Sequence, residues 1–265
     1  MKAGNIARTQ PLFIKSLRLA KSNLGKIGLM VLFDLLFLGS SYALYNIGLF
    51  FAQNIALPKN SSLVLIFLAL TFVYYLIILF AYSFFKYSVL DAIKALFERS
   101  DFSFKRLGRF YALNIVLGVI LFLSVFFANL ILVNTKVQYK VMVFLSFAVP
   151  YLLLFYVIVN ISHSLFYQGC SVKEALKKSL KMTFTRISIY RETILAIILV
   201  ALLMWLFLLG LGYLVRLSGN NYSLYLTLYS YFTNFSAWAT AAVFYMAILI
   251  NRISFYSIAK EGRQL

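Results

Sequence analysis

Residues 62–85 read SLVLIFLALTFVYYLIILFAYSFF and contain no charged side chain. A helix needs roughly 20 apolar residues to cross the hydrocarbon core of a bilayer, which is about 30 Å thick. Inside that core no water is available to hydrogen-bond the backbone, so a spanning segment that is not part of a closed barrel must be helical. This stretch therefore predicts a membrane-spanning α-helix.

Five further stretches have the same character and are rich in Leu, Ile, Phe, Val and Tyr. The composition agrees, because 63% of the 265 residues are apolar and 12% are charged, against roughly 45–50% and 25% in soluble domains. We therefore expect an all-α fold, a polytopic membrane helix bundle in which residues 1–265 form a single integral membrane domain. The six predicted spans are about 28–52, 62–85, 111–133, 141–163, 193–215 and 224–250.

Lysine and arginine divide unequally between the two sides that these spans define. The segments 1–27, 86–110, 164–192 and 251–265 carry 21 of the 25 basic residues, and the other three connections carry four. Cytoplasmic loops are enriched in Lys and Arg, so we expect a cell-membrane protein with both termini in the cytoplasm. In a soluble protein the net charge of +18 would suggest nucleic acid. Here anionic lipid headgroups explain it more simply, and we expect lipids rather than nucleic acid as partners.

Two of the basic segments share a motif. Residues 88–94 read SVLDAIK, and residues 171–177, which lie 83 positions later, read SVKEALK. Residues 15–19 (KSLRL) likewise resemble residues 178–182 (KSLKM). Because a pair of predicted spans follows each copy, we expect three parallel repeats of about 80 residues, each a basic amphipathic helix followed by two spans. Chance similarity among segments rich in Lys, Leu and Ser is the alternative.

The segment from Ser171 to Phe184 has the pattern of an amphipathic helix. Ser171 and Glu174 predict a capping box at its start. The expected apolar face consists of Val172, Ala175, Leu176, Leu180 and Phe184. Such a helix lies in the membrane interface or docks on a cytoplasmic protein, and both alternatives are open. The basic residues expected to contact lipid or a partner are Lys15, Arg18, Lys94, Lys173, Lys177, Lys178 and Lys181.

Asp34 is the one acidic residue inside a predicted span. A charge at the bilayer centre costs roughly 2.5–3.5 kcal/mol on insertion scales, so such a residue is a candidate for a substrate or proton path. The alternative is a paired structural acid near the cytoplasmic end of its helix. For the asparagines within spans, interhelical hydrogen bonds are the alternative. The candidate polar path consists of Asp34, Asn46, Asn129, Asn160 and Asn234.

Catalytic and metal-binding patterns are missing from the sequence. His163 is the only histidine and Cys170 the only cysteine, and seven residues in all are acidic. No phosphate-binding loop, HExxH or GxSxG motif occurs. We therefore expect no enzymatic activity, no catalytic residues, no metal and no cofactor.

Residues 169–180 read GCSVKEALKKSL. This segment resembles an amphipathic element of the membrane domains of bacterial glycerophosphoryl diester phosphodiesterases and their stand-alone relatives, where it follows a span. The resemblance implies a similar architecture. The six spans account for the chain, so we expect the catalytic domain of that family to be absent and carry over no catalytic residue.

Three functions follow as hypotheses. The first is a non-enzymatic membrane scaffold or subunit that contacts lipids or a cytoplasmic protein. The second is a transporter or permease component with a polar path near Asp34. The third, a lipid-handling enzyme, is disfavoured by the scarcity of acidic residues and histidine. The sequence does not give the oligomeric state.

Overall fold

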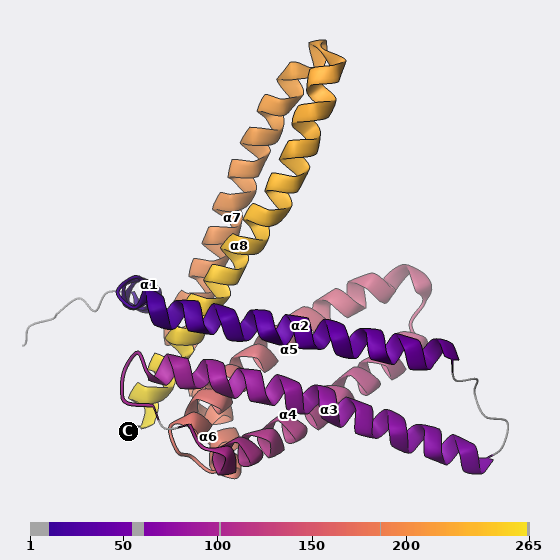
Figure 1. The fold of residues 1–265 in the computed structure, drawn as a ribbon, viewed down its shortest axis with the longest axis vertical. Helices are drawn as coiled ribbons and strands as arrows, with labels where there is room; N and C mark the ends of the chain where they lie inside the picture. Colours follow the sequence, from indigo (N-terminus) through magenta and orange to yellow (C-terminus); the bar gives the residue numbers. More distant parts are fainter. Residues whose placement is uncertain (1–10, 55–60, 101, 186, 264–265) are drawn as a thin grey trace, which may run out of the picture. The chain divides into compact units, whose positions relative to one another are not determined.

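The computed structural model describes residues 11–54, 61–100, 102–185 and 187–263, which are helical apart from short connections (Figure 1). Six of the helices are long and apolar enough to cross a membrane. The predicted all-α, polytopic architecture with six spans is thus confirmed. The elements are α1 (Leu12–Lys21), α2 (Leu24–Asn54), α3 (Ser61–Lys94), α4 (Phe104–Val133), α5 (Val137–Tyr167), α6 (Val172–Thr185), α7 (Ile187–Leu217), the 3-10 turn η1 (Ser218–Asn220) and α8 (Tyr222–Arg263).

The six long helices extend beyond the predicted spans mainly at the ends that adjoin the Lys/Arg-rich segments, which we call the basic ends. Helix α3 continues to Lys94 rather than 85, α4 begins at Phe104 rather than 111, and α8 runs to Arg263 rather than 250. A prediction based on runs of apolar residues identifies only the part of a helix that is immersed in lipid. The backbone hydrogen bonds of the helix do not stop at that boundary.

The helices fall into two compact units, which we describe separately. The four-span unit contains the described part of residues 23–184, from α2 to α6. The hairpin unit contains α1 together with α7, η1 and most of α8. That the whole chain forms a single membrane domain stays a prediction.

In the four-span unit α3 contacts α2, α4 and α5. Tyrosine hydroxyls connect the neighbouring spans within the apolar region. The Tyr74 hydroxyl of α3 donates a hydrogen bond to the Leu44 carbonyl of α2 at 2.8 Å, and the Tyr111 hydroxyl of α4 donates to the Leu76 carbonyl of α3 at 3.1 Å. A hydroxyl in hydrocarbon needs an acceptor, so these bonds also fix how each pair of helices is rotated.

The densest packing of this unit lies at the basic ends. At most 11% of the most apolar stretch of each of α2 to α5 is buried within the protein. Apolar side chains inside a bilayer need no protein cover, since lipid tails are equally apolar, whereas those outside the hydrocarbon do. The largest fully buried side chains of the four-span unit are accordingly Tyr87, Phe110, Met30, Ile93, Leu113, Ile161 and Leu165.

The connection between α5 and α6 is a tight corner. Gly169 has a φ of 103°, the left-handed conformation that glycine adopts without steric cost. Its N–H donates to the Phe166 carbonyl at 2.9 Å, and the Cys170 N–H donates to the Leu165 carbonyl at 3.1 Å. These two bonds form a Schellman motif, which ends α5.

The capping box at the start of α6 is confirmed. The Ser171 N–H donates to Glu174 Oε2 at 3.0 Å, and the Glu174 N–H donates to Ser171 Oγ at 3.3 Å. Each side chain satisfies a backbone donor that the first helical turn leaves without a partner. Helix α6 therefore begins one residue after Ser171.

The other copy of the motif, residues 88–94, was expected to form a separate amphipathic helix. It instead forms the last turns of α3. The positions 83 residues before Gly169 and Cys170 are Lys86 and Tyr87. With no glycine there to take a left-handed conformation, the helix continues through the motif.

In the hairpin unit α7 and α8 run antiparallel, and η1 joins them (Figure 1). Helix α1 contacts α7. It also contacts α8, because the hydroxyls of Ser16 and Ser254 lie 2.9 Å apart in a buried position. The short basic helix is thus held at the basic ends of the two spans.

Candidate functional site

A buried hydrogen-bond chain crosses three helices at the basic ends of the four-span unit. His163 of α5 is fully buried, and its Nε2 lies 2.7 Å from Asn114 Oδ1 of α4. Asn114 Nδ2 in turn donates to Ser83 Oγ of α3 at 2.9 Å. The ring of Phe110 covers the imidazole at 4.9 Å between ring centroids. We call Ser83, Asn114 and His163 the polar chain.

The directions of these bonds determine the tautomer of His163. The Ser83 hydroxyl donates to the Leu79 carbonyl at 2.6 Å, so its oxygen is free to accept from Asn114 Nδ2. With the Asn114 amide in this orientation its oxygen accepts from His163, which places the proton on Nε2. Nδ1 of His163 has no hydrogen-bond partner among the described residues. The imidazole acts here as a donor that joins α5 to α4.

A second polar contact joins the shared motif to α5. The Tyr167 hydroxyl, at the end of α5, donates to Asp91 Oδ1 of α3. Lys94 Nζ lies 5.9 Å from the centroid of the Tyr167 ring, and the ring of Tyr87 packs at 4.9 Å. Asp91 therefore makes a tertiary contact, whereas Glu174, at the same motif position, caps a helix.

Helix α6 presents different faces from those expected. Its buried side chains are Ala175, Ser179, Met182 and Thr183, and the Ser179 hydroxyl lies 2.7 Å from that of Ser162 on α5. Leu180 and Phe184 are 47% and 64% exposed. The expected apolar face thus divides, because Ala175 packs on protein while Leu180 and Phe184 lie on an outer surface among the lysines. Sequence spacing cannot separate two adjacent apolar stripes on one helix.

Helix α1 repeats this arrangement at an offset of 163 residues. Leu12, Ser16 and Ala20 are buried, and they correspond to Ala175, Ser179 and Thr183. Leu17 is 46% exposed, as Leu180 is 47% exposed at the matching position. Each helix therefore packs against the end of a span through a narrow buried stripe that has a serine at its centre.

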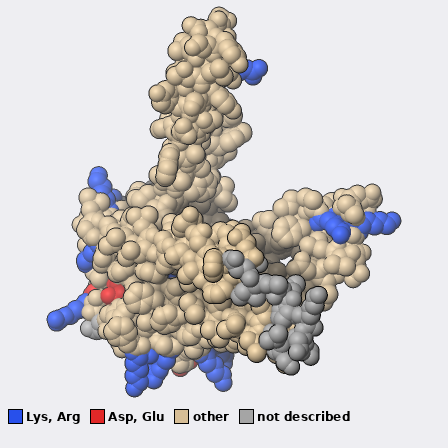
Figure 2. Space-filling view, turned by 45° about the vertical axis from the view of Figure 1, so that its right-hand side comes forward, with Lys and Arg blue, Asp and Glu red and all other residues tan. Residues whose placement is uncertain are grey.

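The predicted interfacial basic residues are on the surface, with one partial exception. Lys94 is half-buried against Tyr167, as described above. Figure 2 shows Lys and Arg side chains projecting from several parts of the visible face, with few acidic side chains among them. The exposed members are Lys15, Arg18, Lys173, Lys177, Lys178 and Lys181.

The five residues of the candidate polar path lie in different environments. Asn46 is exposed and donates to the Tyr42 carbonyl of its own helix at 2.9 Å. Asn129 and Asn234 are exposed, and Asn234 belongs to the hairpin unit. Asp34 is half-buried on α2. Asn160 is buried and donates to the Tyr156 carbonyl of α5 at 2.8 Å. Three of the five are thus exposed, and the five do not all belong to one unit, so the candidate polar path stays a prediction.

The residues that the structure does bring together could be named from the sequence only singly. Asn114 stands out as an amide in a span, and His163 is the only histidine. Their pairing, and the part taken by Ser83, depend on how α3, α4 and α5 are rotated. No spacing in the sequence encodes that rotation.

Metal-ligand groupings do not occur in the part of the chain that the structure describes. A metal site needs several His, Cys, Asp or Glu side chains converging on one point. The polar chain supplies one imidazole, whose Nε2 already donates to Asn114. One imidazole engaged in this way does not by itself make a metal site.

Glu174 lies outside the spans, at the start of α6, and the pKa of its carboxyl is displaced. The backbone N–H of Ser171, with smaller contributions from the Ser171 hydroxyl and the Lys178 charge, lowers the pKa of the Glu174 carboxyl from its ordinary 4.5. These donors stabilise the ionised form. The cap of α6 is therefore fully charged at neutral pH.

Comparison of the chain with protein-family models, with curated proteins and with solved structures gave no match. The resemblance to the membrane domains of glycerophosphoryl diester phosphodiesterases stays a hypothesis that rests on residues 169–180.

Proposed function

We propose that this protein is a non-enzymatic scaffold subunit of the cell membrane whose helices α1 and α6 bind anionic lipid headgroups on the cytoplasmic side. The observation that carries the proposal is the surface common to the two helices. Each buries one stripe against the end of a span and leaves an exposed leucine beside basic side chains.

The exposed side chains of α6 are of the kind that a membrane surface accommodates. Leu180 and Phe184 of α6 are exposed next to Lys173 and Lys177. At a membrane surface, such apolar side chains enter the acyl boundary while lysine stems lie along it and place their ammonium groups among the phosphates. Each basic residue near an anionic surface contributes about 1 kcal/mol.

The attachment of both helices supports a scaffold rather than a mobile tail. Ser179 fixes α6 to Ser162 of α5, and Ser16 fixes α1 to Ser254 of α8. The Schellman corner and capping box also fix the direction in which α6 leaves α5. A helix that is already ordered loses little conformational entropy when it binds a lipid headgroup.

The placement of the polar residues favours a scaffold over a transporter. A transport path needs polar side chains that face one shared cavity or water-filled route. Asn46, Asn129 and Asn234 lie on the surface, and Asn46 bonds within its own helix. The polar chain hydrogen-bonds three helices to one another, as a structural contact does.

Lipid selectivity in reconstituted bilayers tests the proposal. Spin-labelled phosphatidylglycerol and phosphatidylcholine each report the fraction of lipid that the protein immobilises. We expect the wild type to prefer phosphatidylglycerol, and the double variant Lys177→Gln/Lys178→Gln to lose much of that preference. The matched control is Lys136→Gln/Lys140→Gln, which removes two charges at the start of α5 and should reduce the preference less. Equal selectivity in wild type and the α6 variant would refute the proposal.

A further inference from the structure

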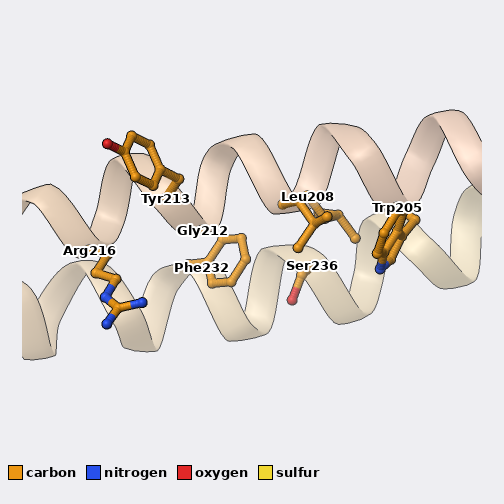
Figure 3. Close-up of a pocket in the computed structure, with 8 residues that line it drawn as sticks. Trp205, Leu208, Gly212, Tyr213, Arg216, Phe232 and Ser236 are labelled. Carbon is orange, nitrogen blue, oxygen red and sulfur yellow. The ribbon is translucent and has the colours of Figure 1, made fainter.

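An open apolar groove of about 510 Å³ runs between α7 and α8 (Figure 3). On α7 its lining residues recur at helical spacing, from Trp205 through Leu208 and Gly212 to Arg216. Phe232 and Ser236 of α8 form the opposite wall. All of these residues belong to the hairpin unit.

The depth of the groove depends on Gly212. A Cβ atom at this position would lie 3.3 Å from Cζ of the Phe232 ring. The absence of a side chain lets the Phe232 ring of the opposite wall lie close to the α7 backbone. By contrast, a Cβ atom at Gly210, two residues earlier, would meet nothing within 4 Å.

The length of the groove matches one leaflet of a bilayer. Trp205 and Arg216 are separated by 11 positions, which at 1.5 Å per residue is about 16 Å along α7. The hydrocarbon core is about 30 Å thick, so one leaflet contributes about 15 Å. With Arg216 at the headgroup level, Trp205 therefore lies near the ends of the acyl chains.

The charge of the groove is confined to one end. Arg216 lies in the last turn of α7, beside η1, and it is the one charged residue of the lining. The Ser236 hydroxyl, deeper in the groove, donates to the Thr233 carbonyl of its own helix at 2.9 Å. Apart from the Trp205 N–H and the Tyr213 hydroxyl, the lining away from Arg216 is thus apolar or already hydrogen-bonded. A guanidinium group binds phosphate oxygens in a bidentate manner.

We propose that this groove binds an anionic phospholipid of the leaflet on the η1 side, with one acyl chain along Gly212 and Phe232 and the phosphate on Arg216. The site lies at the opposite end of the hairpin from α1, so it does not depend on the lipid contacts proposed for α1 and α6.

Quenching of Trp205 fluorescence by brominated lipids tests this site. The sequence has two tryptophans, so a Trp238→Phe background leaves Trp205 as the reporter. Bromine near the ends of the acyl chains places the quencher at its depth. We expect brominated phosphatidylglycerol to associate about fivefold more strongly than brominated phosphatidylcholine, which corresponds to about 1 kcal/mol for one arginine near the surface.

Variants in the same background separate the charge from the shape of the groove. Arg216→Gln should abolish the preference and Arg216→Lys should retain part of it. Gly212→Leu should also abolish it by filling the groove, whereas Gly210→Leu adds the same bulk elsewhere on α7 and should leave it unchanged. Equal quenching by the two lipids in the parent protein would overturn the proposal. So would a preference that persists in Arg216→Gln, or one that Gly210→Leu reduces as much as Gly212→Leu does.

Discussion

His163 Nε2 lies 2.7 Å from Asn114 Oδ1, and both side chains are buried. Asn114 extends the connection to Ser83, so the bonds cross α5, α4 and α3 in turn. They lie at the basic ends, where the four-span unit has its densest packing. The polar chain therefore fixes the rotation of three spans at their basic ends.

The polar chain should contribute measurably to stability. Asn114→Ala leaves the His163 donor buried without an acceptor, which costs roughly 1–3 kcal/mol. We expect the free energy of unfolding, measured by SDS titration in mixed micelles, to fall by that amount. Asn129→Ala removes the same amide from an exposed site on α4 and should change stability by less than about 0.5 kcal/mol. Equal losses in the two variants would show that the polar chain is not a special contact.

The corner between α5 and α6 should tolerate no side chain at Gly169. Its φ of 103° is strained for any L-residue, and Gly169→Ala should destabilise the protein by about 1–2 kcal/mol in the same titration. Gly28 lies within α2, and a Cβ atom there would meet nothing within 4 Å. Gly28→Ala should instead stabilise by about 0.5–1 kcal/mol. A neutral Gly169→Ala variant would contradict the Schellman corner.

Ser16 and Ser179, which attach α1 and α6, should stabilise their helices to the same extent. Ser179→Ala removes the partner of Ser162, and Ser16→Ala removes the partner of Ser254. A buried hydrogen bond contributes about 1 kcal/mol, so each change should speed amide hydrogen exchange in its own helix about fivefold. Ser40→Ala is the control, because its hydroxyl bonds only a carbonyl of its own helix. Faster exchange in α6 but not in α1 would refute the equivalence.

The start of α6 should loosen in acid. The pKa of Glu174 is lowered in the folded state, so its cap contributes above the ordinary pKa of 4.5 and is lost as the pH falls through the lowered value. Amide exchange at the start of α6, corrected for the intrinsic rate, should therefore rise below pH 4.5. Glu174→Gln keeps an uncharged capping box and should remove this pH dependence. The same acid response in that variant would assign it to another group.

Several features of the fold could be predicted from the sequence because each depends on local composition or spacing. The six spans follow from the length of apolar stretches such as residues 62–85, and the capping box follows from Ser171 and Glu174. The end of α3 could not be predicted in the same way. Residues 88–94 and 171–177 share a motif, yet the residues before each decide whether the preceding span stops.

The candidate site was less accessible to sequence reasoning. A polar residue in a span is costly, which makes Asp34 and the asparagines candidates, but that argument says nothing about which way each side chain faces. Asn46 satisfies its amide within its own helix. Asn114 and His163 meet because of interhelical rotation, which a single sequence does not record.

The central claim is that anionic lipid occupies the basic surfaces of α1 and α6. Gentle purification of tagged protein from its native membrane, followed by native mass spectrometry of bound lipids and proteins, tests it most directly. Anionic phospholipid should be retained above its share of the membrane, and Lys177→Gln/Lys178→Gln should lower that excess more than Lys136→Gln/Lys140→Gln does. A stoichiometric cytoplasmic protein lost from the α6 variant, with no excess of anionic lipid in the wild type, would contradict the claim.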